Sequence, residues 1–218
     1  MKNFLTELDN EPLSAITHFI GMLLSIAGLV LLVVYAAKYE TARYVVGFSI
    51  FGATLILLYL ASSWYHFVPV SARKWKSVMQ KIDHSMIYAF IAGTYTPICI
   101  ITLRGGWGWS LFGIIWALAA IGIVWKSLGR YNDLISTALY VIMGWLVVIA
   151  FVPLKNNLSH GGLGWLFAGG IAYTLGAVVY ALEDHYPKRK WFNLHDLWHI
   201  FVLVGSFCHF AFFFWHVL

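Results

Sequence analysis

The stretch HDLWHIFVLVGSFCHFAFFFWHV, residues 195–217, decides the fold class of this chain. Asp196 is its only acidic residue, and it contains no lysine or arginine. Because a helix needs about 20 apolar residues to cross the hydrocarbon core of a bilayer, the stretch predicts a transmembrane helix. Its histidines are costly at membrane depth, so His195, His199 and His209 each need a partner or a function.

The rest of the chain has the same character. Of its 218 residues, 61% are hydrophobic and 11% are charged, whereas a soluble domain carries about 25% charged residues. We predict an all-α membrane protein in which residues 1–218 form a single transmembrane domain. Its seven predicted spans cover residues 14–37, 44–67, 83–103, 107–125, 133–153, 163–183 and 195–217.

The basic residues predict how the spans are oriented. The formal net charge of +5 does not indicate a nucleic-acid partner, because lysines and arginines sit in short segments between the spans. Ten of them fall on the side of the N-terminus and four on the other side. This bias predicts a cytoplasmic N-terminus and a C-terminus outside. The ten are Lys2, Arg73, Lys74, Lys76, Lys81, Lys126, Arg130, Lys188, Arg189 and Lys190, and the four are Lys38, Arg43, Arg104 and Lys155.

This orientation places polar residues of three spans at one depth, near the cytoplasmic side. His66 lies late in the second span, Asp83 opens the third, and His195 and His199 open the last. His195 and His199 are four residues apart and share one helix face. With His66 they offer three imidazoles, and three protein ligands with an open fourth position are typical of catalytic zinc. The alternative is that they form hydrogen-bonded contacts between helices without a metal.

Two further residues complete the predicted site. Asp83 can hold the water molecule that a zinc ion activates and can take its proton. Ser62, on the same helix face as His66, can orient water or substrate. Asp83 has an alternative interpretation as a helix N-cap.

Other polar residues and helix-bending residues receive simpler interpretations. A structural role is favoured for His18. His209 lies about 21 Å along the helix axis from His195, which excludes it from the same metal site. Gly93 and Pro97 are expected to bend the third span. Cys99 and Cys208, both within apolar segments, do not indicate a disulfide.

Four ordered motifs resemble those of bacterial hemolysin III-type proteins of the progestin and adiponectin receptor family. They are EPLSAITH at residues 11–18, SSWYH at 62–66, DHSMIYAFIAGTYTP at 83–97, and HDLWH at 195–199 followed by a later HF. The resemblance implies a zinc ion on His66, His195 and His199, with Asp83 and Ser62 beside it. It also implies a cytoplasmic N-terminus, a place in the bacterial inner membrane and a link to membrane lipid homeostasis.

Because the wider superfamily includes ceramidases, we expect a zinc-dependent hydrolase acting on an amide or ester bond of a membrane lipid. One alternative is a non-catalytic sensor or regulator of membrane state with structural zinc. Another is a haemolysin-like membrane-active protein. A retinal protein is excluded, because no predicted span has a central lysine for the Schiff base. The expected partners are membrane lipids.

Overall fold

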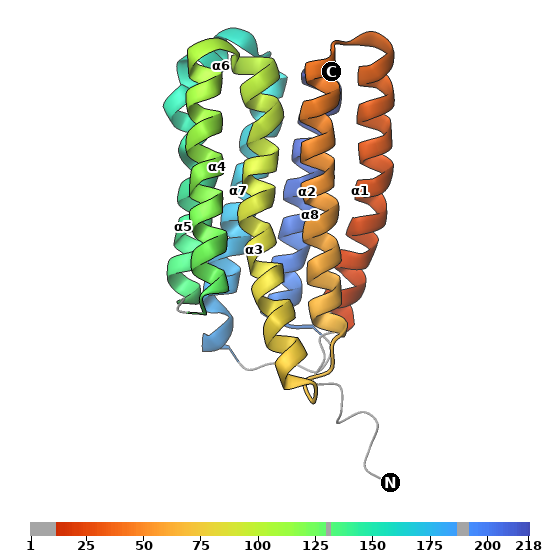
Figure 1. The fold of residues 1–218 in the computed structure, drawn as a ribbon, viewed down its shortest axis with the longest axis vertical. Helices are drawn as coiled ribbons and strands as arrows, with labels where there is room; N and C mark the ends of the chain where they lie inside the picture. The colour runs from red at the N-terminus through yellow and green to blue at the C-terminus, as the bar shows by residue number, and fades with distance from the viewer. Residues whose placement is uncertain (1–11, 130–131, 187–191) are drawn as a thin grey trace.

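A computed structural model describes residues 12–129, 132–186 and 192–218 of the chain. Within these ranges the regular structure is helical, and seven helical segments are long and apolar enough to cross a membrane. They stand side by side, with α1 beginning at one end of the bundle and α8 finishing at the other (Figure 1). The helices are α1 (Pro12–Tyr39), α2 (Ala42–Phe67), α3 (Arg73–Pro97), α4 (Gly105–Ser127), α5 (Asp133–Trp145), α6 (Phe151–Asn157), α7 (His160–Leu182) and α8 (Leu194–His216).

Short segments of other helix types complete three of the spans. A π-helix at Ile98–Leu103 extends α3, a 3-10 helix at Leu146–Ala150 joins α5 to α6, and a second at Glu183–His185 follows α7. Each of the seven predicted spans therefore corresponds to one helical segment, and the predicted fold class is confirmed. Of the residues used for orientation, Lys2, Arg130 and residues 188–190 lie outside the described ranges, as does Glu11 of the first motif.

Two helices extend beyond the predicted spans. The helix of the third span begins at Arg73, ten residues before the predicted start, because its first turns are polar and raise no hydropathy signal. Lys126 was expected in a cytoplasmic segment between spans. It instead lies in the last turn of α4 with its side chain only 1% exposed, and its Nζ donates to Asp133 Oδ1 at 3.0 Å.

The third span changes helix type at Pro97. Proline has no backbone N–H and clashes with the preceding turn, so a regular α-helix cannot continue through it without adjustment. Here the α-helix ends and a π-helix follows, a rare helix type that is found where helices bend. Gly93 has a different role: a Cβ atom there would collide with the Thr54 side chain, so this glycine lets α2 and α3 approach closely.

The fifth span, predicted as continuous, is interrupted after Trp145. A buried backbone that leaves the α-helical pattern needs new hydrogen-bond partners. The Tyr95 hydroxyl of α3 supplies them: it accepts from the Val147 amide at 2.7 Å and lies 2.7 Å from the Gly144 carbonyl oxygen. This side chain therefore fixes the interrupted span against α3.

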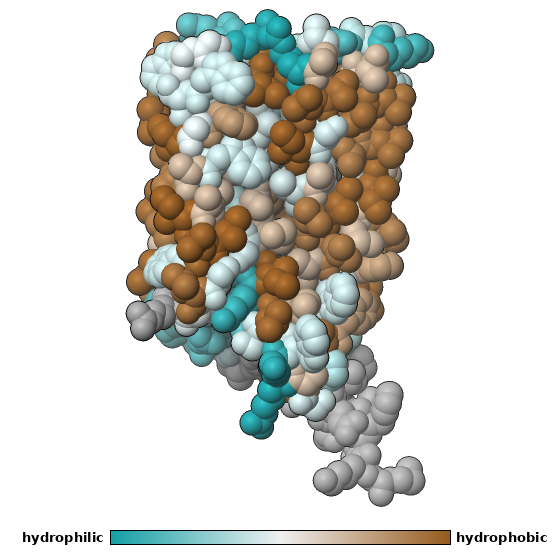
Figure 2. All heavy atoms as spheres, viewed as in Figure 1, coloured by the Kyte–Doolittle hydropathy of each residue, from teal (hydrophilic) through white to brown (hydrophobic). Residues whose placement is uncertain are grey.

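The outer surface suits a lipid environment. Figure 2 shows brown apolar side chains over much of the visible face, with teal hydrophilic ones gathered mainly toward the two ends. Large apolar side chains such as Leu24, Ile121 and Ile149 are about two-thirds exposed, because in a membrane they face lipid tails. Cys99 and Cys208 are both free, which confirms that they form no disulfide.

Candidate metal centre

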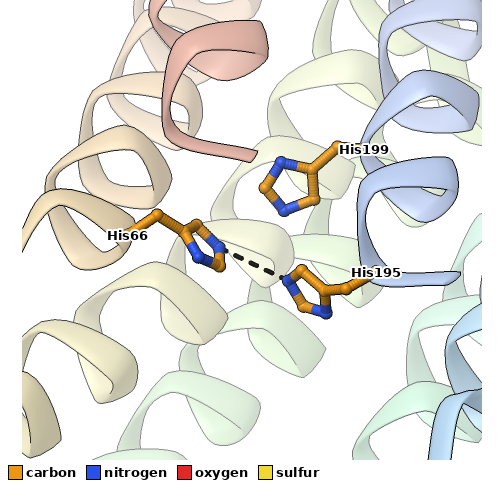
Figure 3. Close-up of side chains that lie close together, drawn as sticks. All are labelled: His66, His195 and His199. Carbon is orange, nitrogen blue, oxygen red and sulfur yellow. Dashed lines mark hydrogen bonds between the residues drawn. The ribbon is translucent and has the colours of Figure 1, made fainter. Parts of the chain in front are cut away.

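Three imidazole rings meet between α2 and α8. His66 is the last residue but one of α2, while His195 and His199 lie in the first two turns of α8 (Figure 3). One ligand nitrogen from each lies within 4.8 Å of the other two. His66 and His199 are buried, and His195 is partly buried. The structure thus brings together the three residues that the sequence analysis proposed as metal ligands.

The separation of the nitrogens fits a tetrahedral ion. His66 Nε2 and His195 Nε2 lie 3.4 Å apart. Two imidazole nitrogens on one zinc ion, each at about 2.0–2.1 Å, are about 3.3–3.4 Å apart at the tetrahedral angle. This pair has the tetrahedral spacing, and with His199 within 4.8 Å the three residues could hold a metal ion.

Hydrogen bonds to the opposite ring nitrogens fix two of these imidazoles. Glu183 Oε2, just after α7, lies 2.8 Å from His195 Nδ1. The Ser14 carbonyl oxygen of α1 lies 3.2 Å from His199 Nδ1. With Nδ1 as the donor in both bonds, each Nε2 keeps its lone pair for a metal. Metal-binding histidines usually have such a carboxylate or carbonyl partner, which sets the tautomer and raises ligand basicity.

The start of α8 is also tied to α1. Asn193 and Asp196 form a capping box, which satisfies backbone N–H groups of the first turn. The Ser14 hydroxyl donates to Asp196 Oδ1 at 2.6 Å, and both side chains are buried. The start of α8 is therefore well defined, and this fixes where His195 and His199 lie along the bundle relative to His66.

Ser62 and Asp83 lie beside the three histidines. His18 Nδ1 is 2.8 Å from Ser62 Oγ, and Ser62 is close enough to Asp83 to interact with its carboxyl group. Asp83 is 8% exposed and lines the same cavity as Ser62, His195 and His199. It lies ten residues inside α3, so the alternative interpretation of Asp83 as a helix N-cap is wrong.

His18 is closer to this site than the sequence indicated. Its ring stacks on His199 with centroids 3.6 Å apart, and its Nε2 is buried without a hydrogen-bond partner in the described part of the chain. Sequence reasoning favoured a structural role for His18 and did not single out Glu183. Both would have been found by applying the depth argument to every span, because the first span begins and the sixth ends on the side of His195.

The cavity that contains these polar groups has mostly apolar walls, although Lys126, Asp133 and Thr137 also line it. It encloses about 1180 Å³ of atom-free space, including its open part, and reaches from Asp83 and His199 to Trp145 and His209. Side chains of α1, α2, α3, α4, α5, α7 and α8 form its walls. Small-molecule sites are concave and mostly apolar, with a few polar groups that orient the ligand. The arrangement therefore suits an amphiphilic ligand whose polar part lies at the histidines.

Comparisons with known proteins found a matching family and several relatives. The family described as Haemolysin-III related matches residues 6–210. Hemolysin-3 of Bacillus cereus is 44% identical over 200 residues, which cover 91% of this chain and 88% of the relative. The Hemolysin-3 homolog of Bacillus subtilis (strain 168) is also 44% identical over 200 residues, which cover 91% of this chain and 90% of the relative. The human monocyte to macrophage differentiation factor is 26% identical over 167 residues, which cover 74% of this chain and 66% of the relative.

A seven-span helical bundle with a histidine cluster that could hold a metal ion defines the class of this protein. Within that class, the chain belongs to the haemolysin III family, as the match over almost its whole length shows. It is a multi-pass membrane protein, and the family resemblance drawn from the four sequence motifs is confirmed.

Proposed function

We propose that this protein is a zinc-dependent hydrolase that cleaves an amide or ester bond of a membrane lipid. The observation that carries the proposal is the cluster of His66, His195 and His199, because His195 and His199 line, together with Asp83, a cavity with mostly apolar walls. Three imidazole ligands, with His66 Nε2 and His195 Nε2 at 3.4 Å, favour zinc among the common divalent ions. Zinc bound there supplies Lewis acidity toward a carbonyl group and lowers the pKa of water.

The residues of the chain would handle the proton. Hydrolysis adds the oxygen of water to the carbonyl carbon, breaks its bond to nitrogen or oxygen, and leaves a proton on the departing group. Asp83 takes the proton from the attacking water and returns it to the leaving group. If His18 Nδ1 donates to Ser62, the Ser62 hydroxyl is left to donate to the nearby Asp83 carboxylate, and such a bond would keep the carboxylate oriented.

The apolar walls would bind the acyl chain and keep bulk water away from the reacting bond. Aromatic side chains including Phe90, Tyr173 and Trp198 line the cavity. Exclusion of water strengthens the electrostatic interactions between Asp83 and the reacting groups. The experiment that tests the proposed function is the release of fatty acid from a short-chain lipid amide by purified protein in detergent. Release should stop on metal chelation and return with zinc.

We further propose that the N-terminus is cytoplasmic, that the C-terminus is outside, and that the membrane is the bacterial inner membrane. The ten-to-four distribution of lysine and arginine supports this orientation. A phosphatase that is active only after export, fused after Leu218, should be active in bacterial cells. A fluorescent protein that folds only in the cytoplasm should stay dark at the same position. The reverse pair of results would overturn the orientation.

A further inference from the structure

His209 lies in the middle of α8, about 15 Å along the helix axis from His199, and lines the far part of the same cavity. Its side chain is only 7% exposed, and its Nδ1 has no hydrogen-bond partner within the described ranges. Ionisable residues at membrane depth usually serve a function. The metal centre does not account for this residue, because His209 is outside the histidine cluster.

The neighbouring hydroxyl groups already have other partners. The Tyr173 hydroxyl lies 3.0 Å from Ser206 Oγ, and Ser206 donates to the Val202 carbonyl at 2.9 Å. Thr174 donates to the Gly170 carbonyl at 2.8 Å. The edge-on contact between the His209 and Tyr173 rings, with centroids 5.5 Å apart, involves no hydrogen bond. A ligand in the cavity is therefore the natural partner for His209.

The packing of the ring selects the nitrogen that a ligand can reach. A Cβ atom at Gly169 of α7 would collide with His209 Nδ1, so this edge of the ring lies against the backbone of α7. Nδ1 is enclosed there, whereas Nε2 is not among the enclosed atoms without a partner and His209 lines the cavity, so Nε2 is the nitrogen that a ligand would contact. A neutral imidazole presents either a donor or an acceptor at Nε2, depending on its tautomer. A hydroxyl group can both donate and accept, so it matches either tautomer without bringing a charge into the apolar cavity.

We propose that His209 forms a subsite for a hydroxyl group on the acyl chain of the ligand, well away from its polar head. This inference rests on the proposed function, because it assumes that the head of a lipid lies at His195 and His199. The shared cavity supports it, since a chain that extends from those residues along α8 passes His209. The preferred ligands would be single-chain lipids with a mid-chain hydroxyl.

Binding of two fatty acids that differ only in this group tests the proposal. Ricinoleate carries a mid-chain hydroxyl that oleate lacks. Each would compete with a fluorescent fatty acid for the full-length protein in detergent. We expect wild-type protein to bind ricinoleate about three- to tenfold more tightly, the effect of one net hydrogen bond. In His209→Phe the preference should vanish while oleate binds as before. His216→Phe, the same change on α8 outside the cavity lining, should keep the preference.

Each other outcome has a defined meaning. Equal affinities in wild-type protein, or a preference that survives in folded His209→Phe, would overturn the subsite. If His209→Phe does not fold, the test is made on wild-type protein with a fatty acid whose hydroxyl group lies next to the carboxyl group. Wild-type protein should bind this fatty acid no more tightly than oleate. Tighter binding of it would overturn the proposal. Binding of neither fatty acid would overturn the lipid cavity as well. A preference for ricinoleate without lipid hydrolysis would overturn only the enzymatic function.

Discussion

Asp83→Asn should lower the rate of lipid amide hydrolysis by about 100-fold or more, while the metal content stays close to that of the wild type. Losing general acid–base help costs about 10²–10⁴-fold. Asparagine has nearly the size of aspartate and can still accept a hydrogen bond from Ser62, but it cannot take a proton from water. The residue is no metal ligand in the proposed site, so metal affinity should fall at most about 10–100-fold.

The measurement compares initial hydrolysis rates of the two proteins, both loaded with metal, with the metal quantified in each sample. Asp184→Asn is a matched control, because Asp184 carries the same carboxylate on an exposed residue after α7. It should hydrolyse the lipid like wild type. Wild-type rates in metal-loaded Asp83→Asn would remove Asp83 from the chemistry. Such rates would favour the alternative, in which the metal is structural and the protein is a non-catalytic sensor of membrane state.

The double change His195→Ala/His199→Ala should remove most of the bound metal. Gently purified wild-type protein should contain about one zinc per chain, because the structure offers one cluster of three histidine nitrogens in its described part. A site reduced from three ligands to His66 alone cannot enclose a tetrahedral ion. Elemental analysis of both purified proteins gives the stoichiometry directly.

His209→Ala is the control for this experiment, since it removes an imidazole from the same helix about 15 Å away and should leave the zinc content unchanged. All three proteins would be compared at similar helical content by circular dichroism. Full zinc retention in the double variant would place the metal elsewhere. Loss of zinc in His209→Ala would show that the content depends on general packing of α8 rather than on ligation.

The sequence was sufficient for the number of spans and for the depth of the polar residues. Long apolar segments can satisfy their backbone in a bilayer only as helices, so hydropathy predicts them well. The depth of a residue in the membrane follows from its position along an oriented span. This argument predicted one depth for His66, Asp83, His195 and His199. The shared helix face of His195 and His199 follows from the helical repeat.

Lateral neighbours were not predictable, because hydropathy does not specify which helices touch. Two contacts of the site depend on how α1 and α7 pack against α8. They are the stacking of His18 on His199 and the hydrogen bond between His195 and Glu183. The interruption of the fifth span depends on the Tyr95 hydroxyl, which a different helix contributes. Burial of Lys126 likewise depends on Asp133 lying beside it.

The central claim is that the three histidines hold a metal that the hydrolysis requires. The most direct test is a zinc titration of chelator-stripped wild-type protein, with fatty acid release from a lipid amide measured at each addition. We expect no release without metal and a linear rise that reaches a plateau at about one zinc per chain. Release at the same rate before and after zinc addition, or no release at full zinc occupancy, would contradict it.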